Sequence, residues 1–490
     1  MLVMPIFLLL FIVVSLTAFL SGNIIGVVVV FAVLVSLSLL IWGKRAAITV
    51  VLLTLFCLST VTTLIKISFI ENLDGQKIFA DFVVTEEPIK VKNGQTAIIK
   101  VNSGELPFNA KMQLSFNDSS LKMGGRYRGY ITVHSATHNK SYYYPDGVYA
   151  SANLKTSVSF IGESKILISL NSLRNYIKSC LYANMSQSEA ATLNAITVGE
   201  KAGFSKDFEI LVRRSGTSHI MVVSGMHFAI IMNAVFTLSN KVFNNKYFRA
   251  VIALLGVLSI SALCGFTMSI LRAGLTYVII ALAPLFKRDY DAINTLCFTV
   301  ILIMMFSPFA VFSVSLQLTF LSTLGILALT PDIMNRLKGC FKGKALRFVD
   351  LLTPLVMTIC ASVMTLPVII YCFGEVSIMS PITNLLVSFA VTLALLSTAA
   401  AIILKSLPFV QILSVPVFDF ANIIAKYIND VISCFGSLPN AAVTINKIWW
   451  VAAALIDVLL ILYIIFSKTS VYLKLLNNLS KKENRHARNS

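Results

Sequence analysis

Leu211–Met232 has the sequence LVRRSGTSHIMVVSGMHFAIIM, and the interpretation of the whole chain depends on it. The stretch opens with two arginines and becomes apolar, yet the apolar part holds two Ser-Gly pairs and two histidines, His219 and His227. Polar side chains are costly in hydrocarbon and usually face a bundle interior or a watery cavity. The segment is therefore either a pathway-lining element or a packed helix whose histidines hydrogen-bond its neighbours, and these residues alone favour neither.

A continuous helix would give the two histidines a defined relationship. It would place His219 and His227 about 12 Å apart along the axis and about 80° apart around it, so both could line one pathway at different depths. The glycines allow close backbone approach or a break in the helix, which is tolerated at membrane depth only against protein or a cavity. We expect a membrane span over residues 218–238.

The composition indicates a polytopic α-helical membrane protein. The 490 residues are 57% hydrophobic and 13% charged, with a mean hydropathy of +0.83. Several apolar runs approach the ~20 residues that cross a bilayer as helix. We predict about 11–12 transmembrane helices, with residues 409–434 left open because they carry Asp419, Lys426 and Asp430. The other predicted spans are residues 5–21, 24–42, 46–65, 218–238, 249–266, 268–286, 292–307, 309–329, 351–373, 382–404 and 447–466.

The chain is strongly basic, with a formal net charge of +18 from 40 Lys+Arg against 22 Asp+Glu. Basic residues concentrate in cytoplasmic loops of membrane proteins, and a positive field also attracts polyanions. Alternating the predicted spans places residues 70–200 outside and nearly every basic cluster of the membrane part inside. The inside set is Lys241, Lys246, Arg249, Lys287, Arg288, Lys405, the cations between residues 336 and 347, and the tail after Phe466.

One sizeable polar region interrupts the apolar chain, at about residues 67–205. β-prone runs separated by Gly, Asn, Asp and Ser predict a small barrel, an OB-fold being one candidate. A helical pattern with apolar residues at four-residue spacing follows and predicts an amphipathic helix at the outer surface. The predicted strands are Lys77–Val84, Thr96–Val101, Met112–Phe116, Tyr127–Val133 and Ser157–Ile161.

The order of His219, Ser224, Gly225 and His227 resembles the signature of the ComEC-type competence proteins, the inner-membrane channels of bacterial DNA uptake. Met226 and Phe228 stand where that family more often has Leu and Val. Further similar elements are a Ser-x-x-Arg-Ala around Arg272, a segment around Gln317 that lacks the family's glycine, and Ser380-Pro381 followed by Asn384. Together they cover about residues 195–390 in the family's order.

The resemblance implies a channel that moves single-stranded DNA through the bacterial cytoplasmic membrane during natural transformation. The implied pathway residues are Arg214, His219, Ser224, Gly225, His227, Arg272, Gln317 and Asn384. For Arg272 the alternative to a pathway role is a side chain that snorkels to the membrane surface. For Gln317 the alternative is a single interhelical hydrogen bond. The outer module offers DNA-binding candidates at Lys90, Lys92, Lys100, Arg126 and Arg128, although a purely structural lid is the alternative there.

The resemblance also implies a division into parts and a set of partners. Implied partners are membrane lipid, an outer DNA receptor, a separate nuclease, a cytoplasmic ATP-driven motor and a second copy of the chain. The parts are N-terminal helices over residues 1–66, an OB-like module over 67–165, an amphipathic connector over 166–206, a channel domain over 207–466 and a basic cytoplasmic tail over 467–490.

Two other functions compete with DNA uptake. One is a small-solute permease whose outer module is a receptor. The other is an intramembrane serine hydrolase using Ser224 with His219 or His227, but Val222-Val223-Ser224-Gly225 lacks the first glycine of the Gly-x-Ser-Gly loop. The scattered cysteines form no C-x-x-C, and no His-x-His-x-Asp-His occurs, so we expect no metal site, no cofactor and no nuclease domain of the metallo-β-lactamase type.

Overall fold

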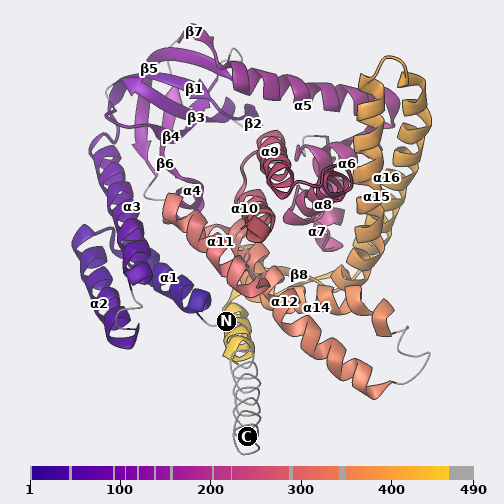
Figure 1. Cartoon of the computed structure of the whole chain (residues 1–490). Helices are drawn as coiled ribbons and strands as arrows, with labels where there is room; N and C mark the ends of the chain where they lie inside the picture. The colour runs from indigo at the N-terminus through magenta and orange to yellow at the C-terminus, as the bar shows by residue number, and fades with distance from the viewer. Residues whose placement is uncertain are drawn as a thin grey trace, which may run out of the picture.

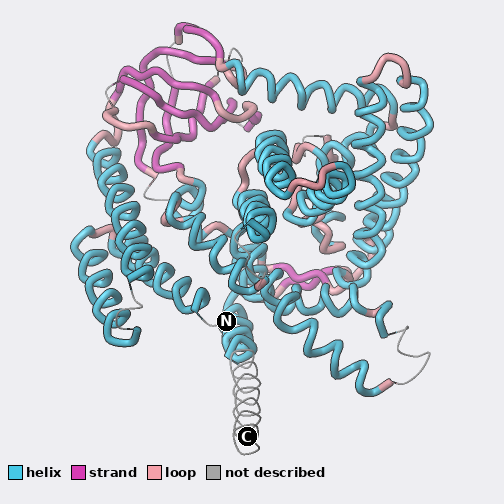
Figure 2. The backbone as a smooth tube through the Cα atoms, in the orientation of Figure 1, coloured by secondary structure: helices cyan, strands magenta, loops and turns pink. Residues whose placement is uncertain are grey.

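The structure is a computed structural model that describes residues 3–42, 47–91, 94–104, 106–117, 121–136, 140–154, 158–200, 203–221, 223–285, 291–341 and 349–462. It is mostly helical, with one β-module near a corner of the molecule (Figures 1 and 2). Two of the predicted features, the basic turn at Lys287 and Arg288 and the tail after Phe466, lie outside the described residues.

The helices follow the apolar runs of the sequence closely. In chain order they are α1 Val3–Ser21, α2 Ile24–Trp42, α3 Ala47–Asn72, α4 Lys140–Tyr143, α5 Lys165–Asn184, α6 Gln187–Thr197, α7 Lys206–Arg214, α8 Gly225–Val242, α9 Lys246–Cys264, α10 Met268–Leu282, α11 Ala292–Phe306, α12 Val314–Cys340, α14 Thr353–Phe373, α15 Ser380–Ser406 and α16 Ser414–Gly436. Short 3₁₀ turns include η3 (Tyr144–Asp146), η5 (Ala310–Phe312) and η6 (Gln411–Leu413), and a last helix is described over residues 450–462.

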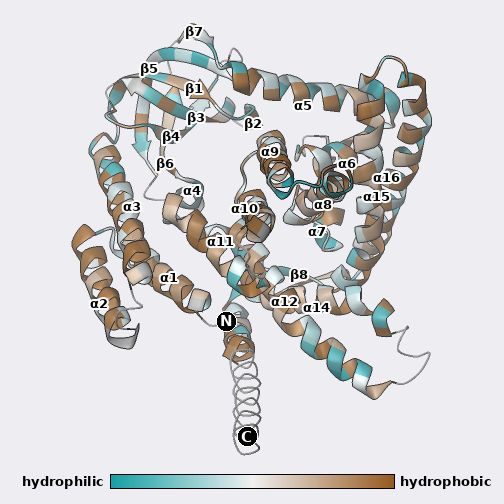
Figure 3. Ribbon diagram, viewed as in Figure 1, coloured by the Kyte–Doolittle hydropathy of each residue, from teal (hydrophilic) through white to brown (hydrophobic). Residues whose placement is uncertain are grey.

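The class of a multi-pass helical membrane protein is confirmed. Among the described residues, six helices are long and apolar enough to cross a membrane, and three shorter apolar helices accompany them. Figure 3, coloured by hydropathy, shows that these helices consist largely of hydrophobic residues. The predicted number of 11–12 spans stays a prediction. The six are Met4–Ser21, Thr49–Asn72, Lys246–Cys264, Val314–Cys340, Thr353–Phe373 and Ser380–Ser406.

The polar region folds into a small OB-like β-barrel. Strands β1, β3, β4, β6 and β5 form a ring, because β5 pairs with both β6 and β1. The β4–β6 pair is parallel and the other pairs of the ring are antiparallel. The strands are β1 Lys77–Val84, β2 Ile89–Val91, β3 Gly94–Gly104, β4 Ala110–Phe116, β5 Gly125–Ser135, β6 Val148–Leu154 and β7 Ser159–Glu163.

The predicted strands all lie on or overlap observed ones, but the sequence did not reveal β2 or β6. Strand β6 has the sequence VYASANL, in which small residues of low strand propensity alternate with polar ones. Its inward face is buried all the same, and Gly147 with φ of 75° turns the chain from η3 into the strand. Barrel closure therefore overrides the weak local preference of β6.

Two apolar cores build the helical part. One joins α1–α3 to α11 and η5, and the Ser15 hydroxyl in it donates to the Pro308 carbonyl oxygen at 2.7 Å. The other joins α5–α7 to α15 and α16. A smaller cluster formed by α8, α9 and α10 lies between them, as Figure 1 shows. Several helices of one predicted segment of the chain pack against helices of another. The predicted boundaries between these segments stay predictions.

Helix α5 leaves the barrel and reaches the end of α15 (Figure 1). Lys405 Nζ of α15 donates to Asn184 Oδ1 of α5 at 3.3 Å, and the Tyr176 and Ser406 hydroxyls lie 3.1 Å apart. Groups in contact cannot lie on opposite sides of a membrane. The predicted alternation, which puts Lys405 inside and residues 70–200 outside, is therefore wrong for Lys405. Helices α14 and α15 are separated by a break at Gly374 and strand β8 (Glu375–Ser377), in agreement with the separate spans predicted over residues 351–373 and 382–404.

Helix α16 covers the sequence that the prediction left open. Its apolar face packs on α6, α7 and α15, while Asp419, Lys426 and Asp430 are exposed. It is absent from the set of candidate spans among the described residues. The chain then forms β9 (Ala442–Thr444), which pairs with β8, before the helix over residues 450–462.

Candidate functional site

The stretch Leu211–Met232 forms a broken helix, so the expected continuous span over residues 218–238 is wrong at its start. Helix α7 ends at Arg214, α8 begins at Gly225, and Gly216 between them has φ of 76°. Ser224 is the N-cap of α8 and forms a capping box with His227, whose Nδ1 accepts from the Ser224 backbone N–H at 3.2 Å. An acceptor at the third helical position satisfies an N–H that a helix start leaves exposed, which favours a new helix here.

The start of α8 packs on the start of α10. The Gly225 backbone N–H donates to Ser269 Oγ at 3.3 Å. A Cβ atom on Gly225 would lie 3.0 Å from Arg272 Nη2, so only a glycine leaves the guanidinium its present place without a shift. His227 and Arg272 are 1% and 9% exposed, respectively. The structure therefore brings four predicted residues together, namely the partly buried Ser224 and Gly225 and the buried His227 and Arg272.

The loop between α7 and α8 lies against β8 and the start of α15. Ser377 Oγ donates to the Arg214 carbonyl oxygen at 2.7 Å, and a Cβ on Gly216 would lie 2.6 Å from Ser380 Cβ. Asn384 Nδ2 donates to Ser380 Oγ at 3.0 Å. The Arg214–Ser377 contact thus brings together two sequence elements that are 163 residues apart. His219 belongs to this loop; the residue is exposed by its accessible surface, although its imidazole lies among protein atoms and interacts with the Gly216 backbone.

The two arginines at the end of α7 hold this junction together. Arg213 Nε lies 3.0 Å from Glu375 Oε2, and Arg214 Nη2 donates to the Leu438 carbonyl oxygen at 2.6 Å. Strands β8 and β9 continue the junction as a two-stranded ribbon. Irregular backbone next to apolar spans is stable only where protein or water satisfies it. Here the arginines, serines and the ribbon supply those partners, and a phosphate at Arg214 would have to displace backbone carbonyls.

Gln317 belongs neither to the contact between α8 and α10 nor to the junction of the α7–α8 loop with β8 and α15. Its Nε2 donates to the Val311 carbonyl oxygen at 3.0 Å, six residues earlier in the chain. The interhelical hydrogen bond considered for this residue is therefore wrong, because its partner lies in the adjoining turn η5. Close packing of α12 is provided further along by Gly325, where a Cβ would lie 2.6 Å from the Cys360 carbonyl oxygen of α14.

The outer barrel carries a row of cations across its strands. Lys111 of β4 pairs in register with Lys100 of β3, Lys100 with Val83 of β1, and Val83 with Arg126 of β5. Directly paired residues point to the same face, and neighbouring strands lie about 4.8 Å apart. The three cations therefore form a curved row, and all three belong to the basic residues from which DNA binding by the outer module is predicted.

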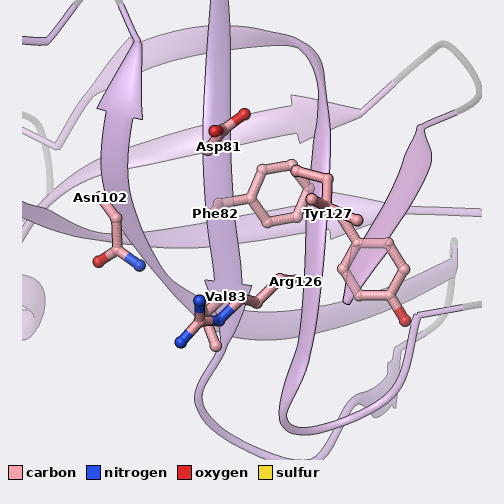
Figure 4. A pocket seen from close by; sticks show the side chains of 7 residues that line it. Asp81, Phe82, Val83, Asn102, Arg126 and Tyr127 are labelled. Carbon is pink, nitrogen blue, oxygen red and sulfur yellow. The ribbon is translucent and has the colours of Figure 1, made fainter. Parts of the chain in front are cut away.

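The other outer candidates are placed less favourably. Arg128 forms an ion pair with Asp81, its Nη2 lying 2.7 Å from Asp81 Oδ2, so its charge is largely compensated. Lys90 is exposed on the short strand β2, and Lys92 lies outside the described residues. Arg126 instead borders a pocket of about 150 Å³ with Asn102 and Tyr127 (Figure 4).

The barrel also carries exposed aromatic side chains. Phe79 and Tyr130 are 38% and 55% exposed, pair directly across β1 and β5, and have ring centroids 5.0 Å apart. Phe160 of β7 is 59% exposed, 5.7 Å from the Tyr127 ring. These aromatics were not among the predicted residues, although the alternation of Phe79 and Tyr130 with buried residues along β1 and β5 was a usable signal.

Two carboxyl groups near the barrel, those of Glu86 and Asp146, have raised pKa values. Glu86 is exposed by its accessible surface, yet partial desolvation by the surrounding protein raises the pKa of its carboxyl; Lys111 and Arg174 partly oppose that effect while Asp146 adds to it. Desolvation likewise raises the pKa of Asp146, again opposed by Lys111. Lys111 and Arg126 are both exposed, but Lys111 is partly balanced by these two carboxyl groups.

Two kinds of chemistry gain no support at the signature. The Nδ1 atom of His227 accepts the Ser224 backbone N–H, so this nitrogen does not serve as base for the Ser224 hydroxyl. Over the described ranges, no three or more His, Cys, Asp or Glu side chains gather as a metal site.

Comparison with known proteins gives a consistent result. The family model described as "Competence protein" matches residues 196–469. This range includes the contact between α8 and α10 and the junction of the α7–α8 loop with β8 and α15. ComE operon protein 3 of Bacillus subtilis (strain 168) is 23% identical over 237 residues. Recombination protein 2 of Haemophilus influenzae (strain ATCC 51907 / DSM 11121 / KW20 / Rd) is 24% identical over 269 residues. No solved structure matches the chain.

These two relatives are much longer than the matched region. The alignments cover 48% and 52% of this chain but only 29% and 30% of the relatives.

Proposed function

Because the chain belongs to the Competence protein family, we propose that it forms a channel for uptake of single-stranded DNA during natural transformation. It is a multi-pass protein of the bacterial cytoplasmic membrane. The observation that carries the proposal most directly is the contact of Gly225 at the start of α8 with Ser269 of α10, beside the buried Arg272. A guanidinium keeps its charge at any physiological pH and can bind phosphate through two donors.

The outer barrel is the proposed first contact with the strand. Proteins that bind single-stranded DNA combine cations that follow the backbone with aromatic faces on which bases stack. The row Lys111–Lys100–Arg126 and the exposed Phe79, Tyr130 and Phe160 supply both groups on neighbouring strands. Binding should therefore be weak at high salt, because counterion release contributes much of the affinity.

The membrane part supplies the later contacts. Polar groups in a bundle are retained where they face a pathway or each other. His219 is exposed, whereas Arg214 and Asn384 are engaged in the junction with β8 and α15. We therefore assign contact with DNA to His219 and Arg272, and a positioning role to Arg214, Ser224, Gly225, His227, Gln317 and Asn384.

The remaining components are proposed to be separate proteins. A duplex that enters as one strand must lose the other, and the sequence contains no His-x-His-x-Asp-His. Strand degradation would then depend on a separate nuclease, delivery on an outer DNA receptor, and the driving force on a cytoplasmic ATP-driven motor. Membrane lipid surrounds the channel, and a homo-oligomer is compatible with this arrangement.

Uptake of labelled duplex and transformation frequency in a clean deletion strain test this function. Arg272→Ala and His219→Ala should reduce both, and Arg272→Lys should restore part of the loss. Lys426→Ala, an exposed position on α16, is the matched control. Normal DNA uptake in the deletion strain together with loss of one solute's uptake would replace the channel by a permease, with the pocket near Arg126 as its receptor site.

The proposed separation from the nuclease needs its own measurement. Purified chain incubated with duplex DNA and Mn²⁺, Mg²⁺ or Zn²⁺ should release no nucleotides. Metal-dependent release that co-purifies with the chain and disappears in a variant of the chain would show that strand degradation is its own activity.

A further inference from the structure

The last described helix contains an acid where the apolar pattern requires a core residue. Over residues 450–462 the sequence is WVAAALIDVLLIL, with Asp457 as its one charged residue. Ala453, Asp457, Leu460 and Ile461 recur at helical spacing, and Ala453 and Asp457 are 6% and 7% exposed. The opposite face is exposed and apolar, as expected for contact with lipid, and consists of Leu455, Ile456, Val458, Leu459 and Leu462.

Asp457 faces a bundle that offers it little compensation. Leu460 and Ile461 pack on a core made by α12 and α14, including Ala328, Leu329 and Met364. The Trp450 ring lies 5.7 Å from the Tyr371 ring and fixes the start of the helix against the end of α14. Asp457 Oδ1 is buried and has no hydrogen-bond partner among the described residues. Of the Asp, Glu, Lys and Arg residues described, only Arg272 and Asp457 are buried.

The titratable groups on the packed elements are few. Cys360 of α14 belongs to the same core, while Tyr371 and Cys372 lie at the end of α14 beside Trp450. On α12, Asp332, Arg336, Lys338 and Cys340 follow the apolar residues of the core, and Lys338 forms an ion pair with Asp350. Lys447 precedes the helix and is exposed. None of the ion pairs found among described residues includes Asp457.

We propose that Asp457 is a proton-binding site within the bundle of α12, α14 and the helix over residues 450–462. A carboxylate without a cation or donor is unstable in an apolar core, whereas the neutral acid is tolerated. In the closed bundle Asp457 therefore carries its proton as –COOH. When the bundle opens to water, the group ionises to –COO⁻ and H⁺ passes to a water molecule. Closing of the bundle and protonation of Asp457 are thus coupled, whatever substrate the channel transports.

A hydrophobic carbodiimide tests the site directly in membranes that contain the full chain. Dicyclohexylcarbodiimide adds to a protonated carboxyl in an apolar environment, and the O-acylisourea rearranges to a stable N-acylurea without a leaving group. Asp457 should be labelled, detected as a mass increase on its peptide, whereas Asp419 and Asp430 on the exposed face of α16 should not. A water-soluble carbodiimide with an amine should give the reverse selectivity.

The pH dependence distinguishes a proton-binding site from a permanently neutral acid. Labelling of Asp457 should fall about tenfold per pH unit once the carboxyl titrates. Asp457→Asn should abolish it and Asp457→Glu should retain it, with protein level and thermal melting confirming that both variants fold. Absence of labelling, labelling that stays constant up to pH 9, or equal reaction of Asp457 and Asp430 with the soluble reagent would each overturn the proposal.

Discussion

Arg174 of α5 closes the C-terminal end of α9: its Nε donates to the Leu263 carbonyl oxygen at 2.7 Å, and its Nη2 to the Ala262 carbonyl oxygen at 3.1 Å. A cation favours this end of a helix because the last carbonyls carry partial negative charge. Gly265, with φ of 78°, then turns the chain into α10, which carries Ser269 and Arg272. One side chain from the connector after the barrel thereby positions the element against which the signature packs.

Replacing this guanidinium should loosen the turn between α9 and α10. We expect Arg174→Gln to lower the free energy of unfolding by about 2 kcal/mol, since two charge-assisted hydrogen bonds are lost. The free energy of unfolding of Arg174→Lys should lie between those of the wild type and Arg174→Gln. DNA uptake should follow the same order. Thermal unfolding in detergent and uptake in cells measure both effects. Lys165→Gln at the exposed start of α5 is the control, and an equal loss there would contradict a specific role of Arg174.

The contacts of Lys405 and Tyr176 predict which side of the membrane the end of α15 faces. In a chain freed of its other cysteines, Ser406→Cys and Ser172→Cys on α5 should react with a membrane-impermeant maleimide from the same side. The native Cys340 at the end of α12 is exposed and serves as the reporter for the opposite side. If Ser406→Cys labels together with Cys340 and not with Ser172→Cys, the contact between α5 and α15 does not exist in the membrane.

The close approach of α12 and α14 should depend on Gly325. A Cβ at this position would lie 2.6 Å from the Cys360 carbonyl oxygen, a backbone atom that cannot rotate away. We expect Gly325→Ala to destabilise the protein by about 1–3 kcal/mol. Gly339→Ala on the same helix has nothing within 4 Å of its Cβ and should be neutral or stabilising by about 1 kcal/mol. Denaturation of the two variants side by side decides the matter, and similar values would refute the packing argument.

The raised pKa of Glu86 predicts a pH effect in the outer module. The folded barrel binds this proton more tightly than the unfolded chain does, so stability falls as pH rises from the ordinary value of 4.5 through the raised pKa. Glu86→Gln should remove the part of this pH-dependent loss of stability that comes from Glu86. Proteolytic susceptibility of strands β1–β5 in the full chain, compared between wild type and variant at each pH, isolates the effect. A constant difference across the range would show that Glu86 does not titrate there.

The sequence revealed the elements better than their junctions. Apolar runs predicted most helices and Lys77–Val84 predicted β1 to the residue, because burial follows local periodicity. The glycines of the signature allowed a break before α8, but its position was not predicted, because His227 acts as the capping-box acceptor where glutamate or glutamine is usual. The side reached by Lys405 was not predictable from alternating spans, because it follows from the contact of α15 with α5, two segments far apart in the sequence.

The candidate site was predictable in part for the same reason. A family-like order of residues identified Gly225, His227 and Arg272, which the fold brings together. That Arg128 is neutralised by Asp81 follows only from the register of β1 and β5, which no single-strand pattern specifies. Asp457 was visible in the sequence as one acid in an apolar run, but its significance requires knowing which face of the helix is buried.

The hydrogen bond from Ser15 to the Pro308 carbonyl oxygen has a consequence for biogenesis. The two residues are 293 positions apart, and the core that α1 and α3 share with α11 cannot form before both have been synthesised. At about 5–20 residues per second, the first helices wait in the membrane for about 15–60 seconds without their native neighbour. During that interval they are exposed to lipid, to insertion factors and to proteases, so the N-terminal helices are where a slow or truncated translation product should first be recognised and degraded.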